Sequence, residues 1–413
     1  MCPAADALHS EHRIAPGDDI GFDAEIPDPL EVTGPDAPWL PEPRMEAKWL
    51  SGAQYPRRAT INLDLPPHER WVELMQEYKY EMIPYFLERR RILAQHTEVD
   101  QGAWVLALER QIPLEYQAEL RSIVATVNHE SIDWNTILLF AAMYEMGSPM
   151  GCSEIIAATE EGVMVHGRNL DYRLVSPLIE VEFVKGGIPA YVGPMFLGNV
   201  GMHTVVVPGA WSFGQNARVS TEDNAGRALQ RLVAGGKLYS LFVRSLADQT
   251  LNYDAVLSTM ANAPLCRSMY LILAGAGAFE GAVVTRAADP SYKRLDEIST
   301  TNWYLVQTND DLDRVPKDGR RVAGIQSMGL LTQARVNPTT ILKIMYSPPL
   351  RSPGNAVLFM MAPMSGLHCS VLGSQSFNDD TSVHCTMNGY TQPFVATHGN
   401  LVRNASSGDD WVS

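Results

Sequence analysis

The feature that most constrains the fold is a change in the spacing of apolar residues near Gly147. From Glu69 to about Tyr144 apolar residues recur three and four positions apart, which is the spacing of helices with one buried face. After Gly147 the apolar runs are short and end at turn-forming residues, as strands do. This boundary predicts an α+β chain, with a helical portion followed by a β-rich portion.

The helical portion is predicted to contain three segments. The second runs from Glu115 to Val127, and the third ends near Met146 with Asp133 as its predicted N-cap. The apolar stripe of the first segment consists of Trp71, Met75, Tyr78 and Met82.

The β-rich portion is predicted to form hairpins with helices inserted between them, which indicates stacked layers of sheet and helix. A strand is also expected before the helices, at Ala59 to Leu65, and two helices are expected at Ala225–Thr250 and Asn252–Ala263. The remaining predicted strands are Cys152–Thr159, Val163–Arg168, Val181–Val184, Met202–Val207, Ala210–Phe213, Met269–Leu273, Ala282–Arg286 and Trp303–Thr308.

The net charge and the arrangement of the cysteines and histidines restrict which partners, metals and compartments are expected. The formal net charge of −15 makes nucleic acid an unfavourable partner and repels an anionic membrane, although a local apolar patch could still touch lipid. Five cysteines without CxxC spacing, and ten dispersed histidines without an HExxH motif, predict neither a metal site nor a cofactor. A small and odd number of cysteines is more typical of a protein in a reducing compartment than of a fold held together by disulfides.

Three further features favour the cytoplasm as the location. The N-terminus lacks the basic and apolar regions of a signal peptide. The longest apolar run, Thr136–Tyr144, is far shorter than the roughly 20 residues of a membrane span. The usable glycosylation sequon, Asn404-Ala405-Ser406, lies in a polar tail.

A predicted hairpin from Gly151 to Tyr172 carries the candidate chemistry. If its turn centres between Glu161 and Gly162, antiparallel pairing sets Asp171 opposite Cys152, with Cβ atoms about 4.5–5.5 Å apart. A regular pleat would put Arg168 on the other face, unless Gly167 marks a bulge or the strand ends there.

This arrangement suits a cysteine nucleophile that needs no histidine. If the peptide bond before Cys152 were broken, its free α-amine, with a reference pKa near 8, could accept the thiol proton. Asp171 would hold that amine, and Arg168 would favour the thiolate or polarise an acyl group. The alternative is structural: Cys152 as a small buried hydrophobe, beside a turn with a surface salt bridge.

The phrase HGRNLDY, with Arg168 and Asp171 at fixed distances after Cys152, resembles the acid ceramidase and N-acylethanolamine acid amidase family. This family belongs to the N-terminal nucleophile hydrolases, and choloylglycine hydrolases are more distant relatives. The likeness extends over roughly residues 60 to 325, and its other clear anchors are Ile61–Pro67, Glu69–Trp71, Trp303–Asp310 and Asp318–Arg321.

The resemblance implies an α+β, four-layer αββα fold, in which two stacked antiparallel sheets lie between helix layers. It also implies a division of the chain by self-cleavage between Gly151 and Cys152. Residues 1–57 would be a partly irregular extension and residues 58–151 a mainly helical smaller (α) subunit. Residues 152–413 would be the larger (β) subunit, with the catalytic cysteine at its N-terminus.

The resemblance also implies roles for five residues. Cys152 would be the nucleophile of both self-processing and hydrolysis, with its α-amine as general base. Asp171 would orient the amine, and Arg168 would help to hold it and the acyl carbonyl. Asn309 would donate its side-chain amide to the oxyanion, unless it merely caps a strand end, and Arg320 would support the pocket.

Three departures from the family pattern bear on these roles. Ala217 stands where the family usually has a glutamate, in the phrase Asn-Ala-Arg, and Gly151 is unusually small for the residue before the nucleophile. The family is secreted or lysosomal and glycosylated, which makes the lysosome the alternative to the cytoplasm.

The expected activity is hydrolysis of a fatty acyl amide, ceramide-like or N-acylethanolamine-like, through a Cys152 thioester. The two cleaved chains are expected to stay associated. Two alternatives remain: another N-acyl substrate, such as a choloylglycine-like or acyl-amino-acid amide, and a lipid-binding relative that never cleaves itself. One apolar run is expected to form core, or else to line an acyl channel or lean on a membrane: Ile137, Leu138, Leu139, Phe140 and Met143.

Overall fold

The computed structural model describes residues 56–95, 99–147, 151–172, 177–220, 223–249, 251–352, 354–372, 383–387 and 390–394. The expected irregular extension over residues 1–57 and the sequon at Asn404 therefore lie almost wholly outside the described residues. The helices are α1 (Val72–Gln95), α2 (Gln101–Gln111), α3 (Leu114–Val127), α4 (Trp134–Ala141), α5 (Ala225–Val233), α6 (Tyr239–Ala247), α7 (Tyr253–Asn262), α8 (Gly319–Leu330) and α9 (Pro338–Tyr346).

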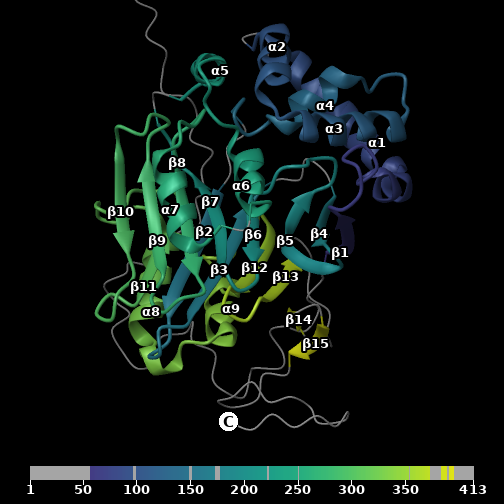
Figure 1. Ribbon diagram of the computed structural model, residues 1–413. Coiled ribbons are helices and arrows are strands. Elements are labelled where there is room, and N and C mark those ends of the chain that lie inside the picture. The colour runs from purple at the N-terminus through teal and green to yellow at the C-terminus, as the bar shows by residue number, and fades with distance from the viewer. Residues whose placement is uncertain are drawn as a thin grey trace, which may run out of the picture. The chain divides into compact units, whose positions relative to one another are not determined.

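The helices α1 to α4 form the helical portion that the apolar spacing predicts, and Figure 1 shows them grouped together. Asp133 caps α4 as predicted, because its carboxylate accepts a 2.9 Å hydrogen bond from the backbone N–H of Thr136. All four residues of the predicted stripe are buried: Trp71, Met75, Tyr78 and Met82. The apolar run expected either in the core or in an acyl channel is buried in the main hydrophobic cluster: Ile137, Leu138, Leu139, Phe140 and Met143.

The strands of the described residues form two sheets. The first has the order β1-β4-β5-β6-β7-β8-β9-β10 and the second β11-β2-β3-β12-β13-β14-β15. The first sheet contains β1 (Arg57–Asn62), β4 (Leu178–Lys185), β5 (Ile188–Phe196), β6 (Thr204–Val207), β7 (Trp211–Ala217), β8 (Met269–Gly275), β9 (Gly281–Arg286) and β10 (Lys293–Glu297). The second contains β2 (Gly151–Ala158), β3 (Met164–Asp171), β11 (Tyr304–Gln307), β12 (Asn355–Ala362), β13 (Leu367–Leu372), β14 (Val383–Met387) and β15 (Tyr390–Phe394).

The two sheets stack face to face between helices, which confirms the four-layer architecture. Apolar residues of both sheets, including Ile156 and Ile272, meet in the layer between them. On its outer face the second sheet packs against α9, where Ile155 and Ile341 share a cluster (Figure 1). Pairing within the sheets is antiparallel except between β1 and β4, which run parallel. The edge strand β1 therefore attaches the start of the helical portion to the first sheet.

Two predictions about secondary structure need correction. The single helix expected over Ala225–Thr250 is two helices, because the chain turns at Gly235 and Gly236 between α5 and α6. Gly235 has a φ of +96°, which favours glycine, and the N–H of Gly236 bonds back to Arg231. The elements α2, α8, α9, β5, β10, β12, β13, β14 and β15 were not predicted, so the helical portion has four helices where three were expected, and β12 pairs directly with β3.

The cysteines also differ from expectation. Cys369 is disulfide-bonded, so the set is not entirely reduced. Cys152 and Cys266 are free and buried. Within the described part of the chain, no helix is both long and apolar enough to cross a bilayer.

Candidate active site

Cys152 lies near the start of β2, fully buried, and its partner in the hairpin is Leu170. The pairing predicted from the sequence, Cys152 opposite Asp171, is therefore wrong by one residue. Asp171 instead pairs with Gly151, and Arg168 pairs with Glu154.

The length of the loop explains the slip. The predicted register assumed a two-residue turn centred between Glu161 and Gly162. In the structure the loop has three residues, Glu160, Glu161 and Gly162, between Thr159 and Val163. The N–H of Thr159 donates to the carbonyl of Val163 at 2.9 Å, and Gly162 has a φ of +86°. A loop of this kind, closed by a glycine in the left-handed region, moves the register by one residue relative to a two-residue turn.

Because side chains alternate along a strand, this shift exchanges the faces of the two candidate partners. Arg168 now shares the face of Cys152 in a regular pleat, and no bulge at Gly167 is needed. Its Nη2 atom lies 3.5 Å from the Cys152 sulfur. Asp171 belongs nominally to the other face and lies at the very end of β3.

The guanidinium of Arg168 is completely buried between the two sheets. Its Nε donates to Glu154 at 2.8 Å, and its two other nitrogens donate to the hydroxyl of Thr204 and the carbonyl of Gln215. Both of these acceptors belong to the facing sheet. They hold the cation in one orientation beside the thiol.

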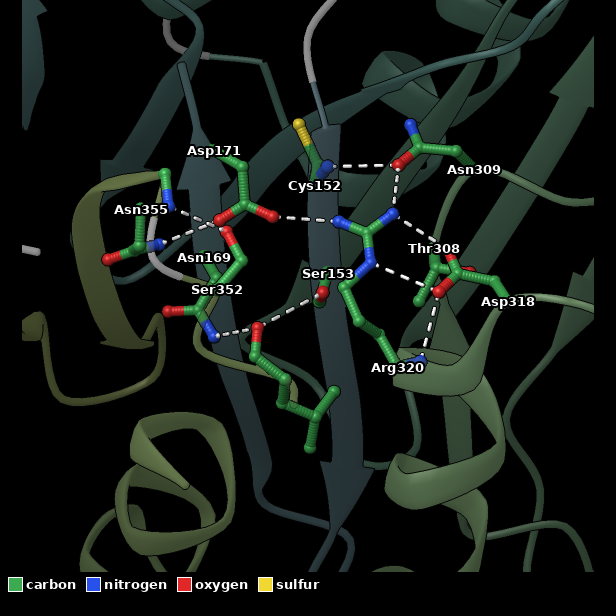
Figure 2. Close-up of polar contacts among 12 residues, drawn as sticks. Cys152, Ser153, Asn169, Asp171, Thr308, Asn309, Asp318, Arg320, Ser352 and Asn355 are labelled. Carbon is green, nitrogen blue, oxygen red and sulfur yellow. Dashed lines mark hydrogen bonds and ion pairs between the residues drawn. The ribbon is translucent and has the colours of Figure 1, made fainter. Parts of the chain in front are cut away.

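Arg320 is the centre of a second set of contacts around Cys152 (Figure 2). Its Nη1 donates to Asp171 at 2.7 Å, and its Nη2 donates to Asn309 at 2.8 Å and to Asp318 at 2.6 Å. Asp318 also caps α8, so the helix start and the arginine are fixed together. Asn355 of β12 donates to the remaining oxygen of Asp171 at 3.2 Å.

Asn309 contacts the backbone at the predicted cleavage position. Its Oδ1 accepts from the N–H of Cys152 at 3.0 Å, and its Nδ2 donates to the carbonyl of Ala217 at 2.8 Å. In the uncut chain the amide group therefore faces the backbone nitrogen of Cys152 with its acceptor. The donor expected to serve an oxyanion is occupied by Ala217, the residue that lacks the family's carboxylate.

The small residue at position 151 has a steric explanation. A Cβ atom there would lie 3.2 Å from Nη1 of Arg320 and 3.2 Å from the Cβ of Asp171. These separations are tighter than ordinary van der Waals contact. Gly151 leaves room for the ion pair of Asp171 and Arg320 directly beside the nucleophile.

Burial dominates the ionisation of Cys152 in the uncut chain. It raises the pKa of the thiol to about 11, with Arg168 opposing the shift and Asp171 adding to it. The thiol is therefore protonated at neutral pH and needs a base before it can attack. The described residues include no histidine in hydrogen-bond contact with Cys152, so its own amine remains the candidate base.

Sequence reasoning missed Glu154 and His166, which are fully buried on the face of Cys152. His166 Nε2 lies 2.8 Å from the second oxygen of Glu154, and its Nδ1 lies 3.0 Å from the hydroxyl of Ser212. A partial signal for them existed: Glu154 is two residues after Cys152 and His166 two before Arg168, which puts each pair on one face of its own strand.

A buried carboxyl also lies shortly before Gly151 in the sequence, at Glu145. Oε1 of Glu145 accepts from the backbone N–H of Tyr239 at 3.0 Å, which caps the start of α6, and Oε2 has no partner. Burial raises the pKa of Glu145 from 4.5 to about 8, although nearby Arg267 opposes the shift. Because the folded pKa exceeds the unfolded one, stability is lost as pH rises between these two values.

We therefore expect Glu145→Gln to stabilise the protein at alkaline pH but not at acid pH. Glutamine keeps the acceptor for Tyr239 and cannot ionise, so the gain should be on the order of a few kcal/mol at about pH 9 and near zero at about pH 5. Thermal unfolding of both proteins across this range measures it. Parallel unfolding temperatures at every pH would contradict it.

Known proteins resemble this chain over most of its length. Residues 54–89 match the family model described as the beta subunit of N-acylethanolamine-hydrolyzing acid amidase. The chain is 26% identical over 333 residues to the N-acylethanolamine-hydrolyzing acid amidase of Caenorhabditis elegans, covering 77% of this chain and 91% of that protein. Identity to the enzyme of the same name from Oryctolagus cuniculus is 29% over 310 residues, covering 70% and 82%.

An acid ceramidase is similarly related. The protein of that name from Balaenoptera acutorostrata scammoni is 27% identical over 349 residues, which cover 76% of this chain and 86% of that protein. These matches agree with the resemblance carried by the HGRNLDY phrase and by the anchors after residue 300. Over most of its length the chain is similar to N-acylethanolamine-hydrolyzing acid amidases and acid ceramidases, and it is a hydrolase of carbon–nitrogen amide bonds.

Proposed function

We propose that the protein hydrolyses fatty acyl amides through a thioester on Cys152, after self-cleavage between Gly151 and Cys152. The observation that supports this most directly is the environment of one residue. The backbone nitrogen of Cys152 is held by Asn309, while its sulfur lies beside the guanidinium of Arg168. The names of the relatives, which specify N-acylethanolamines and ceramide, support a fatty acyl amide as the substrate.

Self-cleavage would use the same sulfur as hydrolysis. The thiol of Cys152 adds to the carbonyl carbon of Gly151, its proton passes to the backbone nitrogen of Cys152, and the peptide C–N bond breaks, so that the acyl group moves to sulfur and the nitrogen becomes an amine. Water then hydrolyses the thioester, leaving a carboxylate on Gly151 and a free thiol and α-amine on Cys152. The side-chain-free Gly151 offers little steric resistance to this attack.

Hydrolysis of the substrate would follow the same pattern with the new amine as base. The α-amine accepts the thiol proton, the sulfur attacks the acyl carbon, and the ammonium returns that proton to the departing amine. Water releases the fatty acid from the thioester. Asp171 and Asn309, both held by Arg320, would keep the amine in place, and Arg168 would stabilise negative charge on sulfur or on the acyl oxygen.

Replacement of Cys152 by alanine tests both parts of this proposal. We expect wild-type protein to separate into two fragments on a denaturing gel, with intact masses that correspond to a break after Gly151. Cys152→Ala should remain one chain and should not hydrolyse a labelled fatty acyl amide. Cys266→Ala, which removes another buried free thiol, is the matched control and should cleave normally. Activity in the Cys152 variant would contradict the proposal.

We also propose that the two fragments, one ending at Gly151 and the other beginning at Cys152, stay together after cleavage. The strand β1 of the first pairs along its whole length with β4 of the second. A buried ion pair between Glu119 and Arg244 joins α3 to α6. These contacts are independent of the peptide bond that breaks.

The disulfide at Cys369 bears on the location of the protein. Disulfides persist in oxidising compartments and are rare in the cytoplasm. We therefore favour the secretory route, with the lysosome as destination, over the cytoplasm, and imaging of the tagged full-length protein tests this choice.

A further inference from the structure

Glu154 is a charged residue in a strand that is otherwise apolar or small after Ser153. Its side chain is fully buried, so its carboxylate has no water to solvate it. One oxygen accepts from Nε of Arg168 at 2.8 Å, and the other lies 2.8 Å from Nε2 of His166. A buried carboxylate is tolerated only with such partners, because desolvating an unpaired charge costs several kcal/mol.

The facing sheet leaves room for this carboxylate at one position. A Cβ atom on Gly214 of β7 would lie 2.1 Å from one oxygen of Glu154 and 2.5 Å from the other. Any side chain at position 214 would therefore displace the carboxylate. Gly214 on β7 thus leaves the space that the carboxylate of Glu154 on β2 fills. The carboxylate is therefore packed into the interface between the two sheets.

We propose that Glu154 is a positioning residue for amide hydrolysis: it fixes the guanidinium of Arg168 so that Nη2 faces the sulfur of Cys152. This inference rests on the proposed role of Cys152 as the nucleophile. The other guanidinium nitrogens of Arg168 bond to Thr204 and Gln215 of the facing sheet, so Nε has Glu154 as its acceptor. Without the carboxylate, the buried guanidinium of Arg168 would lose its negatively charged partner and the hydrogen bond that holds its Nε.

Glu154 also fixes the state of His166. An ionised carboxylate only accepts, so Nε2 of His166 must carry the proton that points to it. With glutamine at position 154, the side-chain amide could face Nε2 as a donor, and the histidine could carry its proton on Nδ1 toward Ser212. Ser212 can in turn donate to the carbonyl of Ala274, 3.5 Å away. The conservative variant therefore has a hydrogen-bonded arrangement open to it.

The charge of Glu154 has an effect separate from its geometry. The ionisable groups that act on the pKa of the Cys152 thiol are Arg168 and Arg320, which lower it, and Asp171 and Glu154, which raise it. Tyr144, buried on the side of the helical portion, is the remaining titratable neighbour. Removing the charge of Glu154 alone should shift ionisation at Cys152, of thiol and α-amine alike, to lower pH.

Two substitutions separate position from charge. Glu154→Ala removes the acceptor of Nε, and we expect kcat for a labelled fatty acyl amide to fall roughly 100-fold with little change in KM, as for misplacement of a reacting group by about 1 Å. Glu154→Gln keeps an acceptor and should restore most of kcat. Its pH profile of kcat/KM should rise at lower pH than that of the wild type.

Glu180→Gln is the matched control, since Glu180 is also buried and paired with an arginine, Arg58, but has no contact with Arg168. Equal kcat values for Glu154→Ala and Glu180→Gln would overturn the inference, and so would a pH profile of Glu154→Gln that superimposes on the wild type. If Glu154→Ala does not fold, the glutamine variant decides the question by its pH profile. Hydrolysis by Cys152→Ala would instead overturn the proposed nucleophile, whatever the Glu154 variants do.

Discussion

Replacing Arg320 with alanine is expected to lower kcat/KM on the order of 1000-fold, a loss comparable to that of one preorganised oxyanion donor, because two residues that position the reacting groups are released together. The guanidinium joins Asp171, Asn309 and Asp318, which come from different elements. Without it, Asp171 keeps a 3.2 Å contact with Asn355, and Asn309 keeps its 3.0 Å contact with the backbone N–H of Cys152, but nothing links the two side chains. Steady-state kinetics on the cleaved protein, together with the rate of self-cleavage, measure the loss.

Two further variants make this prediction specific. Arg320→Lys keeps the charge but not the planar fork that reaches three acceptors at once, so its activity should fall between those of the wild type and Arg320→Ala. Arg294→Ala is the control, because Arg294 also bridges two aspartates, Asp296 and Asp313. Activity of Arg320→Ala equal to that of Arg294→Ala would show that the network does not serve the nucleophile.

Local chemistry explains what could be predicted from the sequence. The stripe from Trp71 to Met82 and the cap at Asp133 depend on residues within one or two helical turns, so spacing alone located them correctly. The layered architecture likewise followed from the alternation of hairpins and helices. The break between α5 and α6 was missed because the apolar spacing continues through Gly235, where the backbone conformation and not the pattern ends the helix.

The faces of the hairpin residues could not be predicted with the same security. Whether Asp171 or Arg168 shares the face of Cys152 depends on a single residue in the loop near Gly162, since a one-residue slip reverses every side chain. The sequence correctly predicted that both residues lie near Cys152. It wrongly predicted that Asp171, and not Arg168, shares the face of Cys152. Arg168 follows from regular pairing, and Asp171 lies at the end of its strand.

The long-range part of the site was accessible only through resemblance. Arg320 lies 149 positions from Asp171, and Asn309 lies 157 positions from Cys152, so no local pattern links them. Glu154 had a local signal, as a charge in a buried strand, but its partners on the facing sheet depend on how the two sheets stack. The roles of Arg320, Asn309 and Glu154 in catalysis remain predictions, and the Arg320 and Glu154 variants described above test them.

The other large effect is expected at the ion pair between Glu119 and Arg244, which would join the two proposed fragments. Glu119 and Arg244 are fully buried, and the two oxygens of Glu119 also accept from Trp71 at 2.8 Å and from Arg70 at 2.9 Å. Arg244 donates further to the carbonyl of Val200. Arg70, Trp71 and Glu119 precede the proposed cleavage position and Arg244 follows it, so the cluster would connect the two proposed chains.

Glu119→Ala should therefore destabilise the protein by about 3–5 kcal/mol, because it leaves the guanidinium of Arg244 buried without its paired carboxylate. Denaturant unfolding measures this loss, and gel filtration of the cleaved variant should show the fragments separating at denaturant concentrations that leave the wild type associated. The double variant Glu119→Leu/Arg244→Met removes both charges and should recover most of the stability, since a buried ion pair is often no better than apolar side chains of similar volume. If the double variant were as unstable as the sum of the single ones, shape and not charge pairing would hold α3 against α6.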